Sequence, residues 1–385
     1  MIPYLYKQQY LGTGSEFRIG SLPSWIECKV TEELNGEFYL EGTLPVGGKN
    51  VDELMVDRII MCAPAPPRPP SGISGDPFSY RDVQPFRIRS IKKPPDSDVV
   101  QVTAFHVSYQ LTENFVEPAS FNYASVQTLF NALLNSSGTL TDYVVPSIGL
   151  FHFVSDITLA NAKQVTHETP VSVRNFLGGD GGVQSLFGGF FDWNGWEVYL
   201  RSEYGLSPRG RPTDIVIAYS KNMESLEFET TVEGLVTGYY GYYKKDYDYV
   251  CAVCYVSNST DYPYQRIEVV DLTNQFESAP TEQALLAALE DYRDEQQPSG
   301  AQIPTSITVT AVPDVLQNVF LCDQVTVLHP DYNIKNVSRV VKTVYDPIRE
   351  RYDAITIGQV QTGITDTIAK MINVTKNVAS GLNGG

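Results

Sequence analysis

Apolar and polar residues alternate on both sides of an Asn-Gly pair near the start of the chain. The segments 26–31 and 37–41 both show this period of two around Asn35-Gly36. An Asn-Gly pair suits a two-residue turn, because both central residues need φ > 0 and these two residue types tolerate it. The alternation predicts two paired strands with one buried face and one solvated face. We therefore expect a β-hairpin at the start of a β domain.

The hydrophobic pattern then divides the rest of the chain into four parts. Strand-like segments run to about residue 118 around the proline-rich stretch 63–77, and predict a first β-barrel domain over 1–118. Helical spacing at 126–134, a second helix beginning near Pro170 and the hairpin FFDWNGWEVYL predict a small α/β domain over 119–204.

Strand patterns return after residue 204. They predict a discontinuous second β-barrel domain over 205–245 and 315–360. Between these segments, TEQALLAALEDYRDEQQ predicts a helix with Thr281 as its N-cap. Apolar residues at helical spacing after Gly363 predict a C-terminal helix. We assign 246–314 and 361–385 to a fourth, small α/β domain.

One arrangement of elements occurs twice along the chain. A strand, a loop, a basic and apolar strand, a turn with Pro and Asp, and an apolar strand follow one another over 56–104 and again over 322–357. This predicts two copies of one small antiparallel barrel. The alternative is that any two antiparallel meanders look alike at this level. The predicted fold is mainly β with α+β insertions: two similar tube-type barrels and two smaller α/β domains.

Charge and composition exclude several classes of function. The chain has 385 residues, 28 basic and 45 acidic, and a net charge of −17, which argues against a general nucleic-acid binder. The N-terminus lacks the pattern of a signal peptide, and no apolar stretch has the length of a membrane span. Five scattered cysteines in such a chain are expected to be reduced and buried.

The sequence offers little for catalysis, metal binding or cofactor binding. The four histidines lie far apart, and no His-Glu-x-x-His motif is present. Cys251 and Cys254 form a lone CxxC, which more often marks buried thiols than a zinc or redox site. The glycine-rich run 177–189 lacks the Lys-Ser/Thr of a phosphate-binding loop. We expect no catalytic residue, no metal and no cofactor.

Two aromatic groups are candidates for contact with a partner. Trp193 and Trp196 flank the second Asn-Gly turn, where they either stack on sugar rings or pack across the hairpin. A tyrosine cluster is denser than a lone strand needs; it either forms a half-buried hairpin or a protein interface. Its members are Tyr239, Tyr240, Tyr242, Tyr243, Tyr247 and Tyr249.

Several of these stretches occur in an order that resembles a known family. They are the hairpin VTEELNGEF, the segment PFRI at 85–88, FFDWNGWEVYL, AYSKNM at 218–223 and VSRVVKTVYDPIRERYDAITIG near the end. Over about residues 1–360 the chain resembles the phage minor structural proteins, also called prophage endopeptidase tail proteins, which form the N-terminal hub part of tail-associated lysins. Lys221-Asn222 and the closing strand-turn-strand are the most specific pieces.

The resemblance implies a baseplate hub in a virion tail tip, assembled in the host cytoplasm. Three chains with two barrels each would form a homotrimeric ring that joins a sixfold tail to a threefold tip. Its partners would be a distal tail protein ring and other tail or baseplate proteins, and DNA would pass the channel without specific binding. Relatives carry a peptidase in a C-terminal extension, and we expect no enzyme in this chain. The alternatives are a tail peptidoglycan hydrolase and a carbohydrate-binding host-adhesion module.

Overall fold

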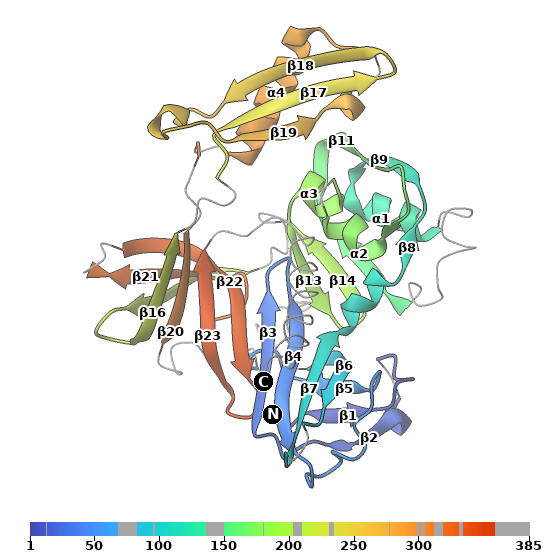
Figure 1. Ribbon diagram of the computed structural model, residues 1–385, viewed down its shortest axis with the longest axis vertical. Helices are drawn as coiled ribbons and strands as arrows, with labels where there is room; N and C mark the ends of the chain where they lie inside the picture. Colours follow the sequence, from blue (N-terminus) through green and yellow to red (C-terminus); the bar gives the residue numbers. More distant parts are fainter. Residues whose placement is uncertain are drawn as a thin grey trace. The chain divides into compact units, whose positions relative to one another are not determined.

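The computed structural model has two compact units, residues 1–227 with 307–385 and residues 228–306 (Figure 1). It describes residues 1–12, 14–67, 83–94, 97–135, 150–179, 181–202, 210–230, 235–276, 278–297, 300–301, 305–311, 319–330 and 334–358. The fold is mainly β, as expected. The C-terminal segment 361–385 and most of the proline-rich stretch lie outside the described residues.

A large mixed sheet organises the first unit. Its early strands are β1 (Tyr4–Tyr6), β2 (Arg18–Ser21), β3 (Glu27–Glu33), β4 (Phe38–Pro45), β5 (Ile59–Cys62), β6 (Gln84–Lys92) and β7 (Val99–His106). Its late strands are β15 (Pro212–Ala218), β16 (Met223–Thr230), β20 (Thr305–Ala311), β21 (Gln324–His329), β22 (Ile334–Asp346) and β23 (Arg351–Gly358).

The β3–β4 hairpin is confirmed, but its turn differs from the expected one. Strand residues pair from Glu27↔Thr43 to Glu32↔Phe38. Asn35 takes φ = 58°, whereas Gly36 is not among the glycines with positive φ. The Glu33 N–H donates to Glu37 O at 2.7 Å, so three residues form the loop. A single left-handed residue at Asn35 therefore turns the chain, as in three-residue hairpin loops.

The early and late strands follow the same spatial order. The early half reads β3-β4-β7-β6-β5-β1, and the late half reads β16-β20-β23-β22-β21-β15. The last three strands of each half form an antiparallel meander, which is β5-β6-β7 in the early half and β21-β22-β23 in the late half. One difference is that β1 pairs antiparallel with β5, whereas β15 pairs parallel with β21. The described strand pairs close neither half into a barrel.

The unit 228–306 is inserted between two consecutive strands of the late half. In the early half a three-residue loop connects β3 to β4, whereas in the late half residues 231–304, nearly all of the second unit, lie between the corresponding strands β16 and β20. A hairpin loop lies on the surface and accepts long insertions at a small entropic cost. The second unit is therefore an insertion at a loop of the second half.

The two halves are joined edge to edge. Strand β22 pairs antiparallel with β3, from Lys342↔Glu33 to Tyr345↔Val30. The Lys342 ammonium lies 3.2 Å from Glu37 Oε2 and 3.6 Å from Glu33 Oε2. Burial lowers the pKa of Lys342, but the two carboxylates more than offset this, and the pKa is raised overall.

Replacing Lys342 with methionine should therefore weaken this junction at neutral pH. We expect a loss of about 0.5–1.5 kcal/mol, because the ion pairs are partly screened by solvent. A raised folded pKa means that the stabilisation is present below the usual lysine pKa of 10.5 and is lost as the pH rises through the folded value. Urea unfolding at pH 7 and pH 11 should show a gap between wild type and K342M that is smaller at the higher pH. An equal gap at both values would contradict the ion-pair explanation.

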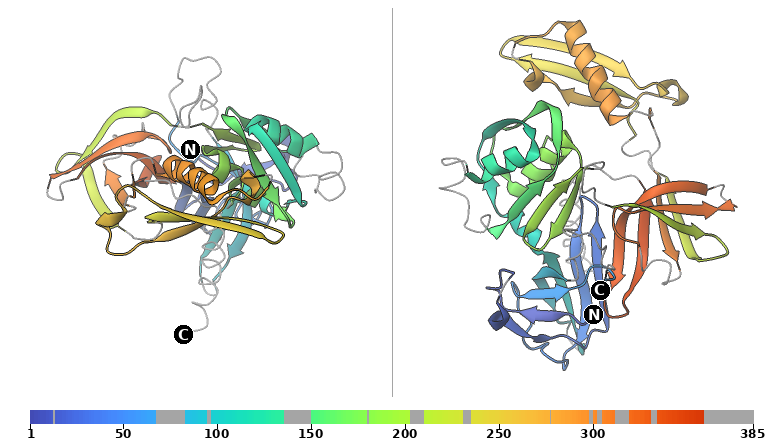
Figure 2. Two further views of the ribbon diagram at one scale, coloured as in Figure 1. Left: turned by 90° about the horizontal axis from the view of Figure 1, so that it is seen from above. Right: turned by 180° about the vertical axis from the view of Figure 1, so that it is seen from behind.

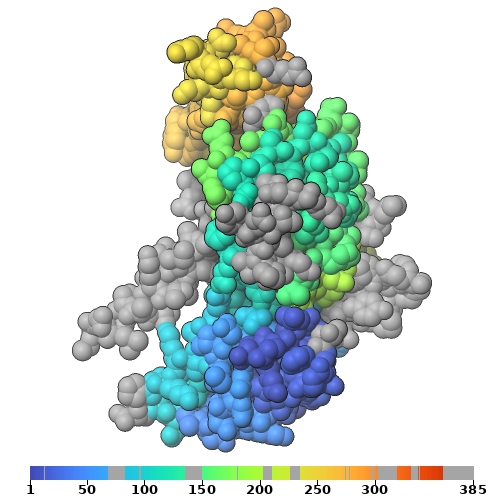
Figure 3. All heavy atoms as spheres, turned by 90° about the vertical axis from the view of Figure 1, so that its right-hand side faces the viewer, coloured from blue at the N-terminus to red at the C-terminus, as the bar shows by residue number. Residues whose placement is uncertain are grey.

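A small α/β region follows the early strands. It contains the 3₁₀ helix η3 (Val107–Thr112), β8 (Phe115–Val116), β9 (Ala119–Ser125), α1 (Val126–Asn135), β10 (His152–Ser155), β11 (Thr158–His167), β12 (Val171–Ser172), α2 (Val173–Gly178), α3 (Val183–Phe187), β13 (Phe190–Asn194) and β14 (Glu197–Arg201). The helices predicted at 126–134 and after Pro170 are confirmed. Buried residues of this region and of the early strands form one continuous core, from Leu5 to Leu200. In the space-filling view the two parts adjoin each other (Figure 3).

The second unit is a three-stranded sheet with one helix. It consists of β17 (Gly238–Lys245), β18 (Asp248–Tyr255), β19 (Ile267–Asp271) and α4 (Glu282–Gln296), with the strand order β18-β17-β19. The N-cap is confirmed, because Thr281 Oγ1 accepts a hydrogen bond from the Ala284 N–H at 3.2 Å. The helix covers one face of the sheet (Figure 2). Strand β17, which the sequence assigned to the second barrel, lies here instead.

Candidate functional site

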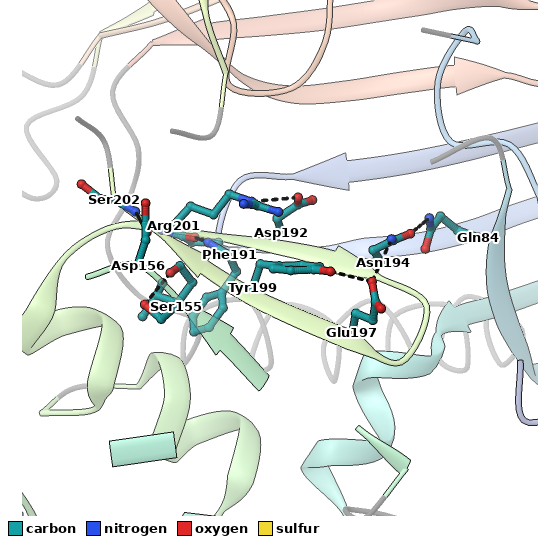
Figure 4. A network of polar contacts seen from close by, with 12 residues as sticks. Gln84, Ser155, Asp156, Phe191, Asp192, Asn194, Glu197, Tyr199, Arg201 and Ser202 are labelled. Carbon is teal, nitrogen blue, oxygen red and sulfur yellow. Dashed lines mark hydrogen bonds and ion pairs between the residues drawn. The ribbon is translucent and has the colours of Figure 1, made fainter. Parts of the chain in front are cut away.

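A network of polar side chains holds the second Asn-Gly turn to the main sheet (Figure 4). Gln84 on β6 donates from Nε2 to Asn194 Oδ1 at 2.9 Å and accepts from the Gly195 N–H at 2.7 Å. The turn is further braced by Glu197, which accepts from Asn194 and from the Tyr199 hydroxyl at 2.7 Å. Burial and this hydrogen bond raise the pKa of Tyr199 to about 12.

The first Asn-Gly turn is likewise held by hydrogen bonds, in this case to the α/β region. Asn35 Nδ2 donates to Gly189 O at 3.3 Å, and Asn35 Oδ1 accepts from the Phe191 N–H at 2.8 Å. Arg174 Nη2 donates to Gly36 O at 3.2 Å. The tip of the β3–β4 hairpin is therefore fixed to α2 and β13 of the α/β region.

Arg174 lies at the centre of this arrangement and is fully buried. It donates to Ser108 Oγ at 3.2 Å, and its guanidinium lies 4.0 Å from the ring centroid of Tyr109 and 5.0 Å from that of Trp193. None of the ion pairs recorded for the described residues joins it to a carboxylate. Burial lowers the pKa of Arg174. Aromatic faces and neutral oxygens thus stabilise the charge in place of an anion.

Ser108, His106 and Gln84 form a chain of hydrogen bonds that superficially suggests a hydrolase. Ser108 Oγ lies 3.0 Å from His106 Nδ1, and His106 Nε2 lies 3.2 Å from Gln84 Oε1. All three side chains are buried, with His106 at 1% exposure, and His106 is stacked on Phe38 at 4.4 Å. A nucleophile needs access to its substrate, so this group has a structural role.

The two tryptophans that the sequence analysis singled out differ in burial. Trp193 is 2% exposed and is stacked on Phe191 with ring centroids 4.9 Å apart. Trp196 is half-buried and lies 6.0 Å from the Tyr10 ring. The packing interpretation therefore describes Trp193, whose side chain does not reach the surface. A sugar stacked on Trp193 would need the hairpin to rearrange.

The predicted tyrosines point to both faces of their sheet. Tyr239 and Tyr243 on β17 are 2% and 1% exposed, and they pack against Tyr292 of α4 and Phe276 respectively. Tyr240 and Tyr242 lie on the opposite face and are half-buried. A contact role stays a prediction for this second pair, because a partner can reach only the face without the helix.

The CxxC pair does not form a site. Cys251 pairs with Tyr242 and Cys254 with Tyr239, so the two thiols lie on opposite faces of the sheet. Four of the five cysteines are buried, and all are free. Among the described residues no group of His, Cys, Asp and Glu has the arrangement to hold a metal ion. Within the same residues, no helix is long and apolar enough to cross a bilayer.

Sequence reasoning found both Asn-Gly turns and missed the residues that hold them. Gln84, Ser108 and Arg174 are isolated polar residues in apolar surroundings, and nothing in their local spacing indicates a common network. The only available signal was that a buried polar residue must find partners.

Comparison with known proteins identifies what this chain is similar to. Residues 211–368 match the family model of the prophage endopeptidase tail proteins. The prophage tail protein gp18 from Listeria monocytogenes has 13% identity and a TM-score of 0.57 over 98% of this chain and 100% of that one. The 43 kDa tail protein of prophage MuSo2 from Shewanella oneidensis has 9% identity and a TM-score of 0.58 over 94% and 99%. No curated protein matches the chain. The resemblance to this tail family is confirmed, and the fold is that of prophage tail proteins.

Proposed function

We propose that the chain is a structural hub protein of a phage tail tip and assembles as a homotrimeric ring. The observation that carries the proposal is the strand order shared by the two halves and their junction through β22 and β3. Each half corresponds to one tube-type β-barrel. Three chains would then present six similar halves, which lets a threefold ring match a sixfold tail.

The charge of the chain fits a protein that DNA passes without binding. Every lysine or arginine contact to phosphate adds salt-sensitive affinity, and the chain carries an acidic excess of 17 charges. In this proposal the ring surrounds or closes the DNA channel in the virion. It contacts a distal tail protein ring and other tail or baseplate proteins.

The mass of the purified chain in solution tests the proposal. We expect light scattering to give about three times the chain mass of 42.8 kDa, and electron microscopy to show rings with a central hole. A monomer at every concentration up to about 100 μM, well above typical assembly affinities, would argue against the ring.

The role is structural, and this chain has no catalytic activity in the proposal. The hydrogen-bonded chain at His106 is buried, which supports a structural role for that group. Incubation of the purified chain with cell walls should release no soluble fragments above a heat-treated sample. Fragment release would favour a peptidoglycan hydrolase, and binding to host glycans would favour an adhesion module.

The segment 361–385 is proposed as a connector to the far end of the ring. Its apolar residues Ile364, Ile368, Met371, Ile372 and Val378 recur at helical spacing. A chain that ends at residue 360 should fold and lose trimer mass. A truncated chain that fails to fold would instead assign the segment to a domain core.

A further inference from the structure

The face of the second unit that α4 leaves open carries aromatic and aliphatic side chains, most of which are exposed and the rest half-buried. We call it the tyrosine face, and it is built from Tyr240, Tyr242, Tyr249, Val253, Tyr255 and Val269. Val269 is 65% exposed, Tyr249 55%, Tyr255 50% and Val253 41%. Such a concentration of apolar side chains on one side of a small sheet marks an interaction surface.

The rings of this face are held in place by one another. The Tyr240 and Tyr249 hydroxyls are 2.9 Å apart, and the Tyr242 hydroxyl donates to Asp271 Oδ2 at 3.0 Å. The Tyr242 and Tyr249 rings are nearly parallel, with centroids 6.3 Å apart. The hydrogen bond to Asp271 raises the pKa of Tyr242. Side chains ordered before binding lose little entropy on contact, which favours association.

The edge of the sheet next to this face is also open among the described residues. Strand β18 is one of the two terminal strands, and its register with β17 runs from Lys245↔Asp248 to Gly238↔Tyr255 without a bulge. Its sequence, DYVCAVCY, contains neither proline nor lysine. Bulges, prolines and lysines are the usual protection of an edge strand against pairing, so β18 is an unprotected edge.

The register shows which backbone groups point outward. Tyr242 O accepts from the Leu272 N–H on the β19 side, so its antiparallel partner Cys251 turns its N–H and C=O away from β17. Tyr249 and Val253 share this orientation by the alternation of the strand. Tyr255 O, also outward, already accepts from Arg293 Nη1 at 3.3 Å. An added strand would find its partners from Tyr249 to Val253.

The charge of the unit selects among the occupants of this edge and face. Residues 228–306 contain 13 acidic and 4 basic residues, and at the rim the exposed Asp246, Asp248 and Asp271 outnumber the exposed Lys244 and Lys245. Nucleic acid is disfavoured by this charge. A second copy of the unit would bring like charge against like charge. The aliphatic residues Val253 and Val269 are the register partners of Tyr240 on the two neighbouring strands, whereas a sugar site is built mainly from free ring faces.

We propose that β18 takes up an extended segment of a partner protein in which apolar residues alternate with lysine or arginine. The segment adds as a fourth strand to the edge, its apolar side chains extend the tyrosine face, and its basic residues meet the acidic rim. This proposal does not depend on the trimeric ring, and either can fail without the other.

The test uses the full chain and two synthetic peptides of eight residues. One alternates valine with lysine, and the other carries glutamate in place of every lysine. We expect calorimetry to show binding of the lysine peptide only. Val253→Pro removes an outward-facing N–H and no bond to β17, and should weaken binding at least tenfold. Val253→Thr keeps the N–H and the branched shape, and should stay within about threefold of wild type.

A charge variant keeps the test decisive if V253P does not fold. Asp248 is the first residue of β18. The substitution Asp248→Lys should weaken binding of the lysine peptide several-fold and strengthen binding of the glutamate peptide. Failure of both peptides to bind, or equal binding of both, would overturn the proposal. Binding of the sugar chitotetraose that depends on Tyr249 would also overturn the proposal, because it would indicate a glycan-binding surface. A concentration-dependent increase in mass that V253P abolishes would assign the edge to a second copy.

Discussion

Replacing Arg174 with alanine should lower the free energy of unfolding of the first unit by about 3–5 kcal/mol. The side chain is fully buried, and its loss leaves a cavity between Tyr109 and Trp193. It also leaves Ser108 Oγ and Gly36 O without the donor that they share. All three tryptophans, Trp25, Trp193 and Trp196, lie in the first unit, so tryptophan fluorescence during urea unfolding measures this unit alone.

Methionine at the same position is the matched control. A buried charge without an anion bears a large desolvation cost, and replacing it with an apolar residue of similar volume is often close to neutral. We expect R174M to lie within about 1.5 kcal/mol of wild type, the usual range of well-packed apolar replacements. If R174M is as damaged as R174A, the hydrogen bonds to Ser108 and Gly36 outweigh packing. If R174A is nearly neutral, the site does not hold the β3–β4 hairpin to α2.

The strands and helices were largely predictable because their signals are local. Alternation around Asn35-Gly36 located β3 and β4, helical spacing located α1, and Thr281 located the start of α4. The turn at Asn35 was predicted with two central residues and has three, because the last hydrogen bond between the strands joins the Glu33 N–H to Glu37 O. A hydrophobic pattern does not determine that last pair.

The recurring order of strands was visible as a pattern, and in space it extends to six strands of each half, with β2 as an additional strand of the early half. The position of β17 was not predictable in the same way. GYYGYYKK is apolar on both faces, and such a strand fits the centre of any sheet. The choice of sheet depends on the packing of Tyr239 and Tyr243 against Tyr292 and Phe276, which are remote in sequence.

The burial of the candidate contact residues was also not predictable from the sequence. Tyrosines in alternation announce a strand with two different faces, but the sequence does not say which face the helix covers. Tyr239 and Tyr243 were candidates on equal terms with Tyr240 and Tyr242, and only the packing of α4 separates them. Trp193 entered the core because Arg174 of α2, which is remote in sequence, covers its ring together with Phe191, its neighbour on β13. Remote contacts of this kind leave no periodic signal.

Alanine at Gly42 should be among the most damaging small substitutions in the chain. Gly42 lies on β4 opposite Cys28 of β3 and Val102 of β7, with strands on both sides. A Cβ atom at this position would fall against the Glu27 carbonyl oxygen and within 2.8 Å of the Trp25 ring and 3.0 Å of Cys28 Cα. Backbone atoms inside a sheet have no room to move aside, and Trp25 is buried. We expect G42A to cost about 2–4 kcal/mol through overpacking.

Gly47, just beyond the end of the same strand, provides the control. A Cβ atom there meets nothing within 4 Å, and the backbone is outside the left-handed region. G47A should be neutral or stabilising by about 0.4–1 kcal/mol, because alanine restricts the unfolded chain more than glycine does. Urea unfolding followed by tryptophan fluorescence should therefore separate two identical chemical changes five residues apart by several kcal/mol. Equal effects at the two positions would mean that β3 and β4 separate enough to admit a methyl group. Such a result would contradict the close pairing of β3 and β4, which supports the junction between β22 and β3.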